Sequence, residues 1–169
     1  MAESESVIGL IHQNLITTLD GITIPYNGSD HIAKAEYQRT EDYFNQSPYI
    51  AVGFSGTVKM ESSSRTTRRK AKFEVFCYVN DINDQYNPDL SEANQKKAIT
   101  EVLKNMPSYI EKELLKDITR AANASLTEVG DIDQFFIPTL GNESVSFVTY
   151  LEVFVQYYVD QFDPFARVG

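Results

Sequence analysis

Cysteine, histidine and tryptophan are nearly missing from this sequence of 169 residues, which has one cysteine, two histidines and no tryptophan. A single cysteine cannot form a disulfide within the chain, so stability has to come from an apolar core, and the chain is long enough to build one. Cys77 falls on the apolar face of a predicted strand, where we expect a small buried side chain rather than a reactive thiol. His12 and His31 stand in no pattern that pairs them with a serine or cysteine nucleophile. The sequence therefore predicts one domain over residues 1–169, without a catalytic site.

Long apolar runs are also missing, since no stretch approaches the roughly 20 apolar residues that span a bilayer. The amino terminus, Met1-Ala-Glu-Ser-Glu-Ser, is acidic, whereas a secretory signal has basic residues followed by an apolar stretch. We therefore expect a soluble protein in a reducing cytoplasm, with no membrane partner.

Positive charge is scarce: 15 Lys and Arg residues face 24 Asp and Glu residues, which gives a formal net charge of −9. Affinity for a nucleic-acid backbone comes mainly from clustered basic residues, so this balance argues against a general nucleic-acid binder. One segment departs from the acidic average, because residues 65–72 contain five basic residues and no acidic one. Such a local patch favours a specific acidic partner. Its basic residues are Arg65, Arg68, Arg69, Lys70 and Lys72.

The N-terminal third predicts one helix followed by short β-structure. Apolar residues recur at spacings of three and four from Ile8 onward, which indicates an amphipathic helix over about Ser6–Leu19 with Ser6 or Ser4 as a possible cap. The pattern of residues 22–26 is typical of a short strand at an edge or a strand end. The polar segment Ser29–Ser47 is expected to be a loop, with at most a short helix near Ile32–Tyr37.

A long β-hairpin dominates the middle of the chain. An apolar run opens at Tyr49 and continues more weakly to Met60. Arg68–Val79 alternates strongly, with an apolar face from Ala71 to Val79 and a second face that mixes charge with two aromatic residues. A segment rich in Ser and Thr joins these stretches, so we expect an antiparallel hairpin with a polar, basic tip. A projecting hairpin of this length usually contacts another chain, because it buries little surface of its own.

Helical and β patterns follow the hairpin. A helix is expected from about Asp89 or Ser91, and apolar residues continue its stripe to Ala122. Pro107 either divides this segment into two helices or kinks a single one. Short strands are expected at Leu126–Val129 and Phe135–Pro138, around Gly130.

The last predicted strand, Ser144–Asp160, carries apolar residues on both faces. One face is mostly Val, Leu and Phe, and the other includes Tyr150, Phe154 and Tyr158. A strand of this kind is either central in its sheet or covered by another subunit. Together the elements predict an α+β fold, in which a mostly antiparallel β-sheet with a long β-hairpin has its helices packed on one face.

No group of residues predicts a reaction centre, a cofactor site or a metal site. Asp131 and Asp133 could form a carboxylate pair, but they flank a glycine turn in which Asp is common. The acidic segment Asp81–Asp84 with Asp89 lacks the glycine and the terminal glutamate of a calcium loop. The aromatic residues of Phe73–Tyr78 could stack on single-stranded nucleic acid, a hypothesis that the net charge of −9 opposes.

The order and character of the elements resemble the tail terminator, or tail completion, proteins of long-tailed bacteriophages. The resemblance runs from Val7 to Asp160 and rests on element order rather than on an invariant motif. The longer Ser29–Ser47 segment and the long helical segment depart from the family pattern, which leaves the tail type open. The resemblance is carried by the N-terminal helix, the strand Pro48-Tyr-Ile-Ala-Val-Gly53, the return strand Phe73-Glu-Val-Phe-Cys-Tyr-Val79 followed by Asn-Asp, a helix, and the closing strand Phe147-Val-Thr-Tyr-Leu-Glu-Val-Phe-Val-Gln-Tyr157.

This resemblance implies a structural virion protein that is made in the host cytoplasm and resides in the tail or neck. A small α+β domain of that family forms a hexameric ring, caps the completed tail tube and joins the tail to the head. The implied partners are other copies of the chain, the tail tube protein and the head or neck connector proteins, while DNA passes through the ring without specific binding. The resemblance implies no enzyme activity and no cofactor.

Two groups of residues are the candidate contact sites of such an assembly. One is the basic limb of the hairpin and the other is the aromatic face of the last strand. Two other functions stay open: a different neck, connector or tail tube protein, and a non-viral α+β domain with an apolar pocket for a small molecule. The candidate contact residues are Arg65, Arg68, Arg69, Lys70, Tyr150, Phe154 and Tyr158.

Overall fold

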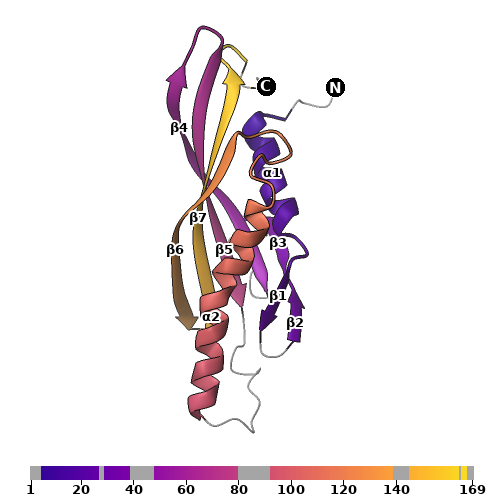
Figure 1. Cartoon of the computed structure of the whole chain (residues 1–169), viewed down its shortest axis with the longest axis vertical. Coiled ribbons are helices and arrows are strands. Elements are labelled where there is room, and N and C mark those ends of the chain that lie inside the picture. The colour runs from indigo at the N-terminus through magenta and orange to yellow at the C-terminus, as the bar shows by residue number, and fades with distance from the viewer. Residues whose placement is uncertain are drawn as a thin grey trace.

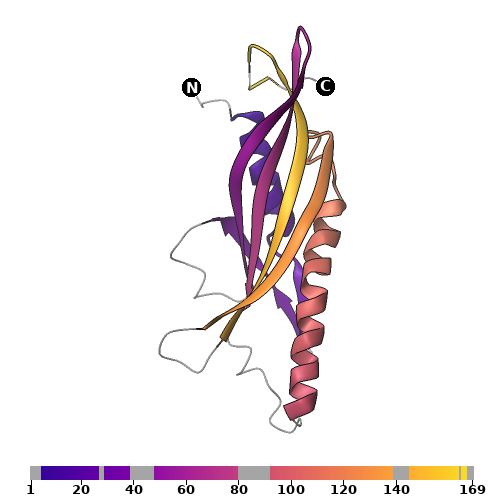
Figure 2. The same ribbon diagram turned by 90° about the vertical axis from the view of Figure 1, so that its left-hand side faces the viewer.

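The computed structural model describes residues 5–26, 29–38, 48–79, 92–138, 145–163 and 165–166 (Figure 1). Within these ranges the chain is long and narrow, and its strands run along the long axis (Figures 1 and 2). The helices are α1 (Val7–Leu19) and α2 (Glu92–Leu115), and the strands are β1 (Thr23–Tyr26), β2 (Ser29–Ile32), β3 (Lys34–Tyr37), β4 (Tyr49–Ser62), β5 (Thr66–Val79), β6 (Leu126–Pro138) and β7 (Val145–Asp160).

Five strands form one sheet in the order β3-β4-β5-β7-β6, and β1 and β2 form a separate antiparallel pair. Only β3 and β4 pair in parallel within the larger sheet. The expected hairpin is confirmed, since β4 pairs with β5 from Tyr49 opposite Tyr78 to Ser62 opposite Thr67. The last strand is central, as one reading of its two apolar faces predicted, because β7 lies between β5 and β6. The predicted α+β fold with a mostly antiparallel sheet is therefore correct.

The sheet twists strongly along its length, as right-handed strands require. In Figure 1 the upper half of β4 lies at the left of the molecule, and the lower half of β6 lies on the same side below it. The upper half of β4 and the lower half of the outer strand β6 are thus on one long side, offset along the axis. The hairpin of β4 and β5 forms the upper end, beyond the end of α1 (Figures 1 and 2).

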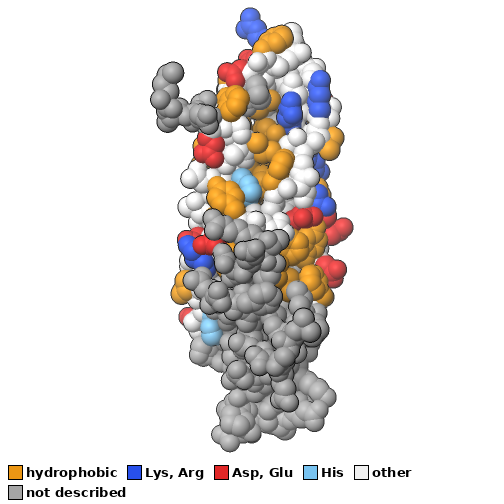
Figure 3. Space-filling view, turned by 180° about the vertical axis from the view of Figure 1, so that it is seen from behind, with side chains coloured by type: hydrophobic (Ala, Val, Ile, Leu, Met, Phe, Trp, Pro, Cys, Tyr) orange, Lys and Arg blue, Asp and Glu red, His pale blue; other side chains and the backbone are white. Residues whose placement is uncertain are grey.

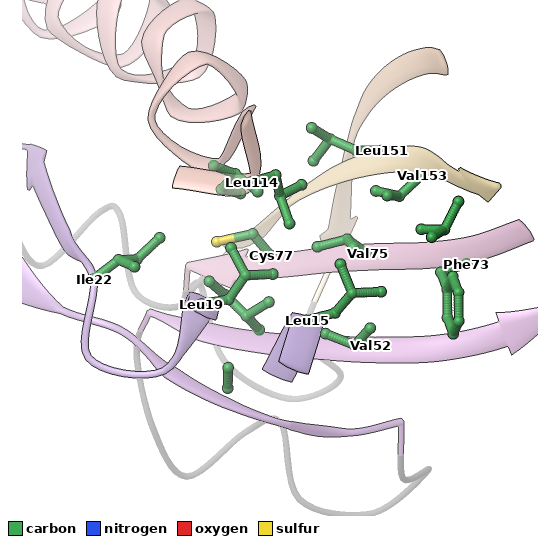
Figure 4. Close-up of a cluster of buried hydrophobic side chains, with 14 of the residues drawn as sticks. Leu15, Leu19, Ile22, Val52, Phe73, Val75, Cys77, Leu114, Leu151 and Val153 are labelled. Carbon is green, nitrogen blue, oxygen red and sulfur yellow. The ribbon is translucent and has the colours of Figure 1, made fainter. Parts of the chain in front are cut away.

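The core fills the space between one face of the sheet and both helices (Figure 4). α1 packs against β3 and β4, whereas α2 packs against β6 and β7. Alternate residues of β5 point into this layer, and all five predicted core residues, from Ala71 to Val79, are fully buried. Truncating a buried Leu such as Leu15, Leu19 or Leu114 to Ala is expected to cost about 2–5 kcal/mol. We call the sheet face that carries this layer the inner face, and the opposite one the outer face.

The N-terminal helix begins and ends where the sequence predicts. Ser6 is the N-cap residue, and its hydroxyl accepts a hydrogen bond from Gly9 N at 3.2 Å. After Leu19 the chain turns at Gly21, whose φ of 80° is a conformation that favours glycine. The Asp20 carboxylate then accepts a hydrogen bond from Ala35 N at 2.9 Å, which ties the helix end to β3.

The interpretation of Ser29–Ser47 as a loop with a short helix is wrong for its first part. This part contains β2 and β3, and residues 39–47 lie outside the described residues. Pairing with β1 and β4 stabilises these short strands, since their own apolar pattern is weak. The buried positions are small alanines, Ala33 and Ala35, which give little periodic signal.

The second helical segment is one helix that contains Pro107, and it ends at Leu115 rather than near Ala122. Ile118 continues the sequence pattern but is 41% exposed. The Asp117 carboxylate stops the helix by accepting hydrogen bonds from Thr119 N, Thr119 Oγ1 and Ala121 N at 3.0, 2.7 and 2.6 Å. Next in the chain, the two predicted short strands are one strand, β6, with an irregularity between Val129 and Ile132.

Candidate interaction surface

The outer face carries alternating charged and aromatic side chains along β5 and β7. The two strands pair without a bulge from Thr66 opposite Asp160 to Val79 opposite Phe147, so the rows stay aligned over their whole length. Side chains directly opposite each other on one face contact each other. The outer-face pairs are Arg68 with Tyr158, Lys70 with Gln156, Lys72 with Phe154, Glu74 with Glu152, and Phe76 with Tyr150.

The basic segment of the sequence is largely neutralised by carboxylates from neighbouring strands. Lys72 forms an ion pair and hydrogen bond with Glu152 on β7. This contact lowers the pKa of the Glu152 carboxyl and raises the pKa of the Lys72 amine. On the same face, Lys70 Nζ lies 3.9 Å from Glu128 Oε2 on β6. Counting charges along the sequence therefore overstates the positive field of this surface.

Arg68 also has partners within the chain. Its guanidinium donates a hydrogen bond to the side-chain oxygen of Gln156 and lies 3.9 Å from the Glu61 carboxylate on β4. Its side chain is only 29% exposed. Arg68 therefore joins β4, β5 and β7 near the hairpin end of the sheet.

Arg69 and Arg65 do not lie on the outer face beside Arg68 and Lys70. Arg69 is paired with Lys59 and Tyr157, on the inner face. Burial raises the pKa of Tyr157, and the charge of Arg69 opposes that shift. Arg65 is exposed at the hairpin turn, where its carbonyl accepts a hydrogen bond from Gln161 N at 2.9 Å. The four predicted basic contact residues thus occupy two faces and a tip.

Tyr150 is half-buried on the outer face. Its ring centroid lies 5.0 Å from that of Phe76, and its hydroxyl oxygen lies 3.2 Å from Glu74 Oε1 and 3.1 Å from Glu152 Oε1. One hydroxyl proton is therefore shared between two carboxylates. Burial, followed by these hydrogen bonds and charges, raises the pKa of Tyr150.

Phe154 is half-buried between a cation and a glycine. Lys70 Nζ lies 4.6 Å from the centre of its ring, a cation–π distance. A Cβ atom added to Gly130 would lie only 2.6 Å from Cε2 of the same ring. The ring thus covers a glycine of the outer strand β6, an arrangement that compensates for the missing side chain. Tyr158, by contrast, is 37% exposed.

Sequence reasoning did not identify the two open edges of the sheet. β3 pairs with β4 only from Tyr49 to Val52, and β6 is the last strand of the sheet, so among the described strands none continues beyond either edge. Large apolar side chains are exposed along both edges. They are Phe54, Val58 and Met60 on β4, exposed by 48%, 68% and 43%, and Ile132 and Phe135 on β6, exposed by 43% and 40%.

The residues considered above as candidates for catalysis or metal binding can now be placed in the fold. Cys77 is fully buried, as predicted, and burial raises the pKa of its thiol to about 12. His12 Nε2 lies 2.8 Å from Val52 O, so this nitrogen donates to the carbonyl. Asp131 and Asp133 are exposed on β6, and Asp133 accepts a hydrogen bond from Gln134 N. The segment Asp81–Asp84 with Asp89 lies outside the described residues.

Among the residues that the structure describes, no three His, Cys, Asp or Glu side chains are grouped closely enough to hold a metal ion. Neither helix, over its described residues, has the length and apolar character needed to cross a bilayer. No protein-family model matches the chain, and no curated protein matches its sequence.

Proposed function

We propose that this chain is a structural virion protein, a tail terminator that forms a hexameric ring on the completed tail tube of a long-tailed phage. Its partners are other copies of itself, the tail tube protein and the neck or head connector proteins. The proposal starts from the resemblance in element order. The observation that carries it is the hairpin end of the sheet, which extends past the end of α1 and has exposed apolar and basic residues (Figures 1 and 2).

This end is suited to subunit contacts for a physical reason. Val58 and Met60 are exposed apolar residues on a strand that keeps an open edge, and Arg65 is exposed at the tip. Contiguous exposed apolar surface is uncommon on a monomer and marks interaction sites. A ring needs head-to-tail contacts between different surfaces of each subunit, and a projecting hairpin that reaches a neighbour provides one of these surfaces.

The filled interior favours a role in assembly over the alternative role of binding a small molecule. The space between the inner face and the helices is occupied by buried Val, Leu, Ile and Phe side chains, several of which are drawn in Figure 4. A small-molecule site needs a cavity lined by a few polar groups. A neck or tail tube protein would use the same contacts, so the position of the ring in the particle is what separates these structural roles.

Imaging of the native assembly tests the proposal. The chain would be produced together with the tail tube and neck proteins of its own genome, and tubes would be examined by electron microscopy with a label on this chain. The expected result is a six-fold ring at the head-proximal end of each tube, and tubes of irregular length when the chain is left out. A label distributed along the tube would assign it to the tube instead, and absence from every particle would overturn the virion role.

A further inference from the structure

We propose that two copies of the free protein pair about a twofold axis, with the open edge of β4 in each copy lying along the open edge of β6 in the other. The pair would be a state of the protein outside the particle, because it covers the hairpin edge that the proposed ring uses. It rests on the edges and charges of the sheet and does not require the tail function.

The backbone offers the first argument. Beyond Val52, β4 has one side that no described strand pairs with, and the same holds for the outer side of β6. Such edges carry unpaired N–H and C=O groups and accept a strand from another chain. Exposed apolar residues on both strands, Val58 at 68% and Ile132 at 43%, would be covered by that pairing.

The charges of the two edges indicate that the strand pairing with each edge comes from a second copy of the chain. β6 contains Glu128, Asp131 and Asp133 and no basic residue. Neither of the two aspartates forms an ion pair in the described part of the chain, although the charge of Asp131 contributes to the raised pKa of Lys72. The β4 edge has Lys59 exposed, with Arg65 at the adjacent tip, while its acidic residue Glu61 already lies near Arg68. Opposite charges on facing strands stabilise pairing, and like charges oppose it.

The shape of the chain fixes the symmetry. Both open edges lie on the same long side of the molecule, β4 in the upper half and β6 in the lower half (Figure 1). Figure 3 shows this side at its right, with Lys and Arg side chains above and Asp and Glu side chains below, next to hydrophobic ones. A second copy turned end for end therefore places its acidic β6 against the basic β4 of the first, and its own β4 against the first copy's β6. Two equivalent contacts form and the assembly closes as a dimer.

β-bulges limit the length of strand that can pair with the second copy. Register shifts interrupt β4 between Phe54 and Gly56 and between Lys59 and Glu61. Natural proteins use such bulges to limit edge pairing. The regular stretches left for pairing are Gly56–Lys59 on β4 and Ile132–Pro138 on β6. The pair is accordingly short in each contact and reversible, which leaves the hairpin available to other partners.

Reciprocal charge exchange tests the pair. Lys59→Glu makes the β4 edge acidic, and Asp131→Lys with Asp133→Lys makes the β6 edge basic. Sedimentation velocity of the wild type is expected to show a monomer–dimer equilibrium, and each variant alone should associate on the order of tenfold more weakly. An equimolar mixture of the two variants should recover dimers, because both contacts are then between opposite charges. Lys104→Glu on the exposed surface of α2 is the matched control and should dimerise like the wild type.

Cross-linking provides a second readout that does not depend on charge. A chain with Val58→Cys and Ile132→Cys should give covalent dimers with a short bismaleimide, whereas either single substitution should give none. The native Cys77 is fully buried and should not react in the folded protein. A ladder of trimers and larger species would overturn the twofold geometry, and dimers from the single variants would assign the contact to a different pair of strands.

The outcomes separate this inference from the tail role. A wild type that stays monomeric when concentrated, or a mixture that behaves like its components, overturns the pairing and leaves the ring on tail tubes to be judged by imaging. Dimers that respond to charge exchange, from a chain absent from every particle, support the pairing and overturn the tail role.

Discussion

Replacing Gly130 by Ala should destabilise the protein, although glycine is normally unfavourable in a strand. The added Cβ would lie 2.6 Å from Phe154 Cε2, 3.1 Å from Phe154 Cδ2 and 3.4 Å from Glu152 Cβ. A separation of 2.6 Å is too short for two carbon atoms, so the ring has to move away from its position below Lys70. Overpacking of this kind costs about 1–3 kcal/mol. Backbone conformation gives no competing explanation, because the glycines with positive φ are Gly21 and Gly56.

The same substitution should change sign when the ring is removed. In a Phe154→Leu background the shortest contact, to Cε2, is removed. Ala in place of Gly then lowers the entropy cost of folding by roughly 0.5–1 kcal/mol. Urea unfolding of the four proteins of this double-mutant cycle measures the coupling, which should be at least about 1 kcal/mol. If Gly130→Ala stabilises the protein with Phe154 intact, or if the two substitutions are additive, the packing of the ring over Gly130 is not the reason for the glycine.

Three further changes test other parts of the structure. Ala121 has a φ of 54°, so Ala121→Gly should stabilise the protein by up to about 1 kcal/mol in urea unfolding. The control Ala98→Gly, in the interior of α2, should destabilise it by about 1 kcal/mol. Equal effects of the two substitutions would contradict the left-handed turn at Ala121. Hydrogen bonding to Lys72 lowers the pKa of Glu152 in the folded protein. The ionised Glu152 carboxylate therefore stabilises the fold above its ordinary pKa of 4.5, and this stabilisation is lost as the pH falls through the lowered pKa. Glu152→Gln should flatten this part of the curve of unfolding free energy against pH. Arg65→Glu should leave the melting temperature unchanged, since the residue is exposed at the turn. Under the proposed tail function it should impair capping of tail tubes, and normal capping would remove Arg65 from the proposed contact site.

The elements that could be predicted from the sequence have patterns that tertiary contacts reinforce. The strong alternation from Arg68 to Val79 predicted both the strand and its buried face, because a half-buried strand repeats every two residues. The same rule places Arg68 and Arg69 on opposite faces of the sheet. Counting basic residues along the sequence treats them as one patch and does not show this. The helix end at Leu115 was missed because Ile118 and Ala122 continue the apolar spacing, while the side-chain hydrogen bonds of Asp117 that stop the helix leave no periodic signal.

The candidate interaction surface was less accessible to prediction because it depends on the order of strands in the sheet. Which strands are outermost cannot be derived from the pattern of β4 or β6 alone. The carboxylates of Glu128 and Glu152 that neutralise Lys70 and Lys72 come from strands more than fifty residues further along the sequence. Their effect on the basic segment therefore appears only when β7 and β6 are placed beside β5.

The central position of β7 has a consequence for how the protein is made. β7 joins β5 to β6, yet it follows both in the sequence, and its side-chain contacts with β5 span 80 residues from Lys72 to Glu152 and 88 from Arg68 to Gln156. Contacts of such separation form slowly, and during synthesis they have to wait until the last strand has left the ribosome. Until then β6 has no neighbour in the sheet and the β4–β5 hairpin lacks half of its support. A nascent chain therefore cannot complete the sheet until β7 has emerged and paired with β5 and β6. The subunit contacts proposed above would have to wait for that step.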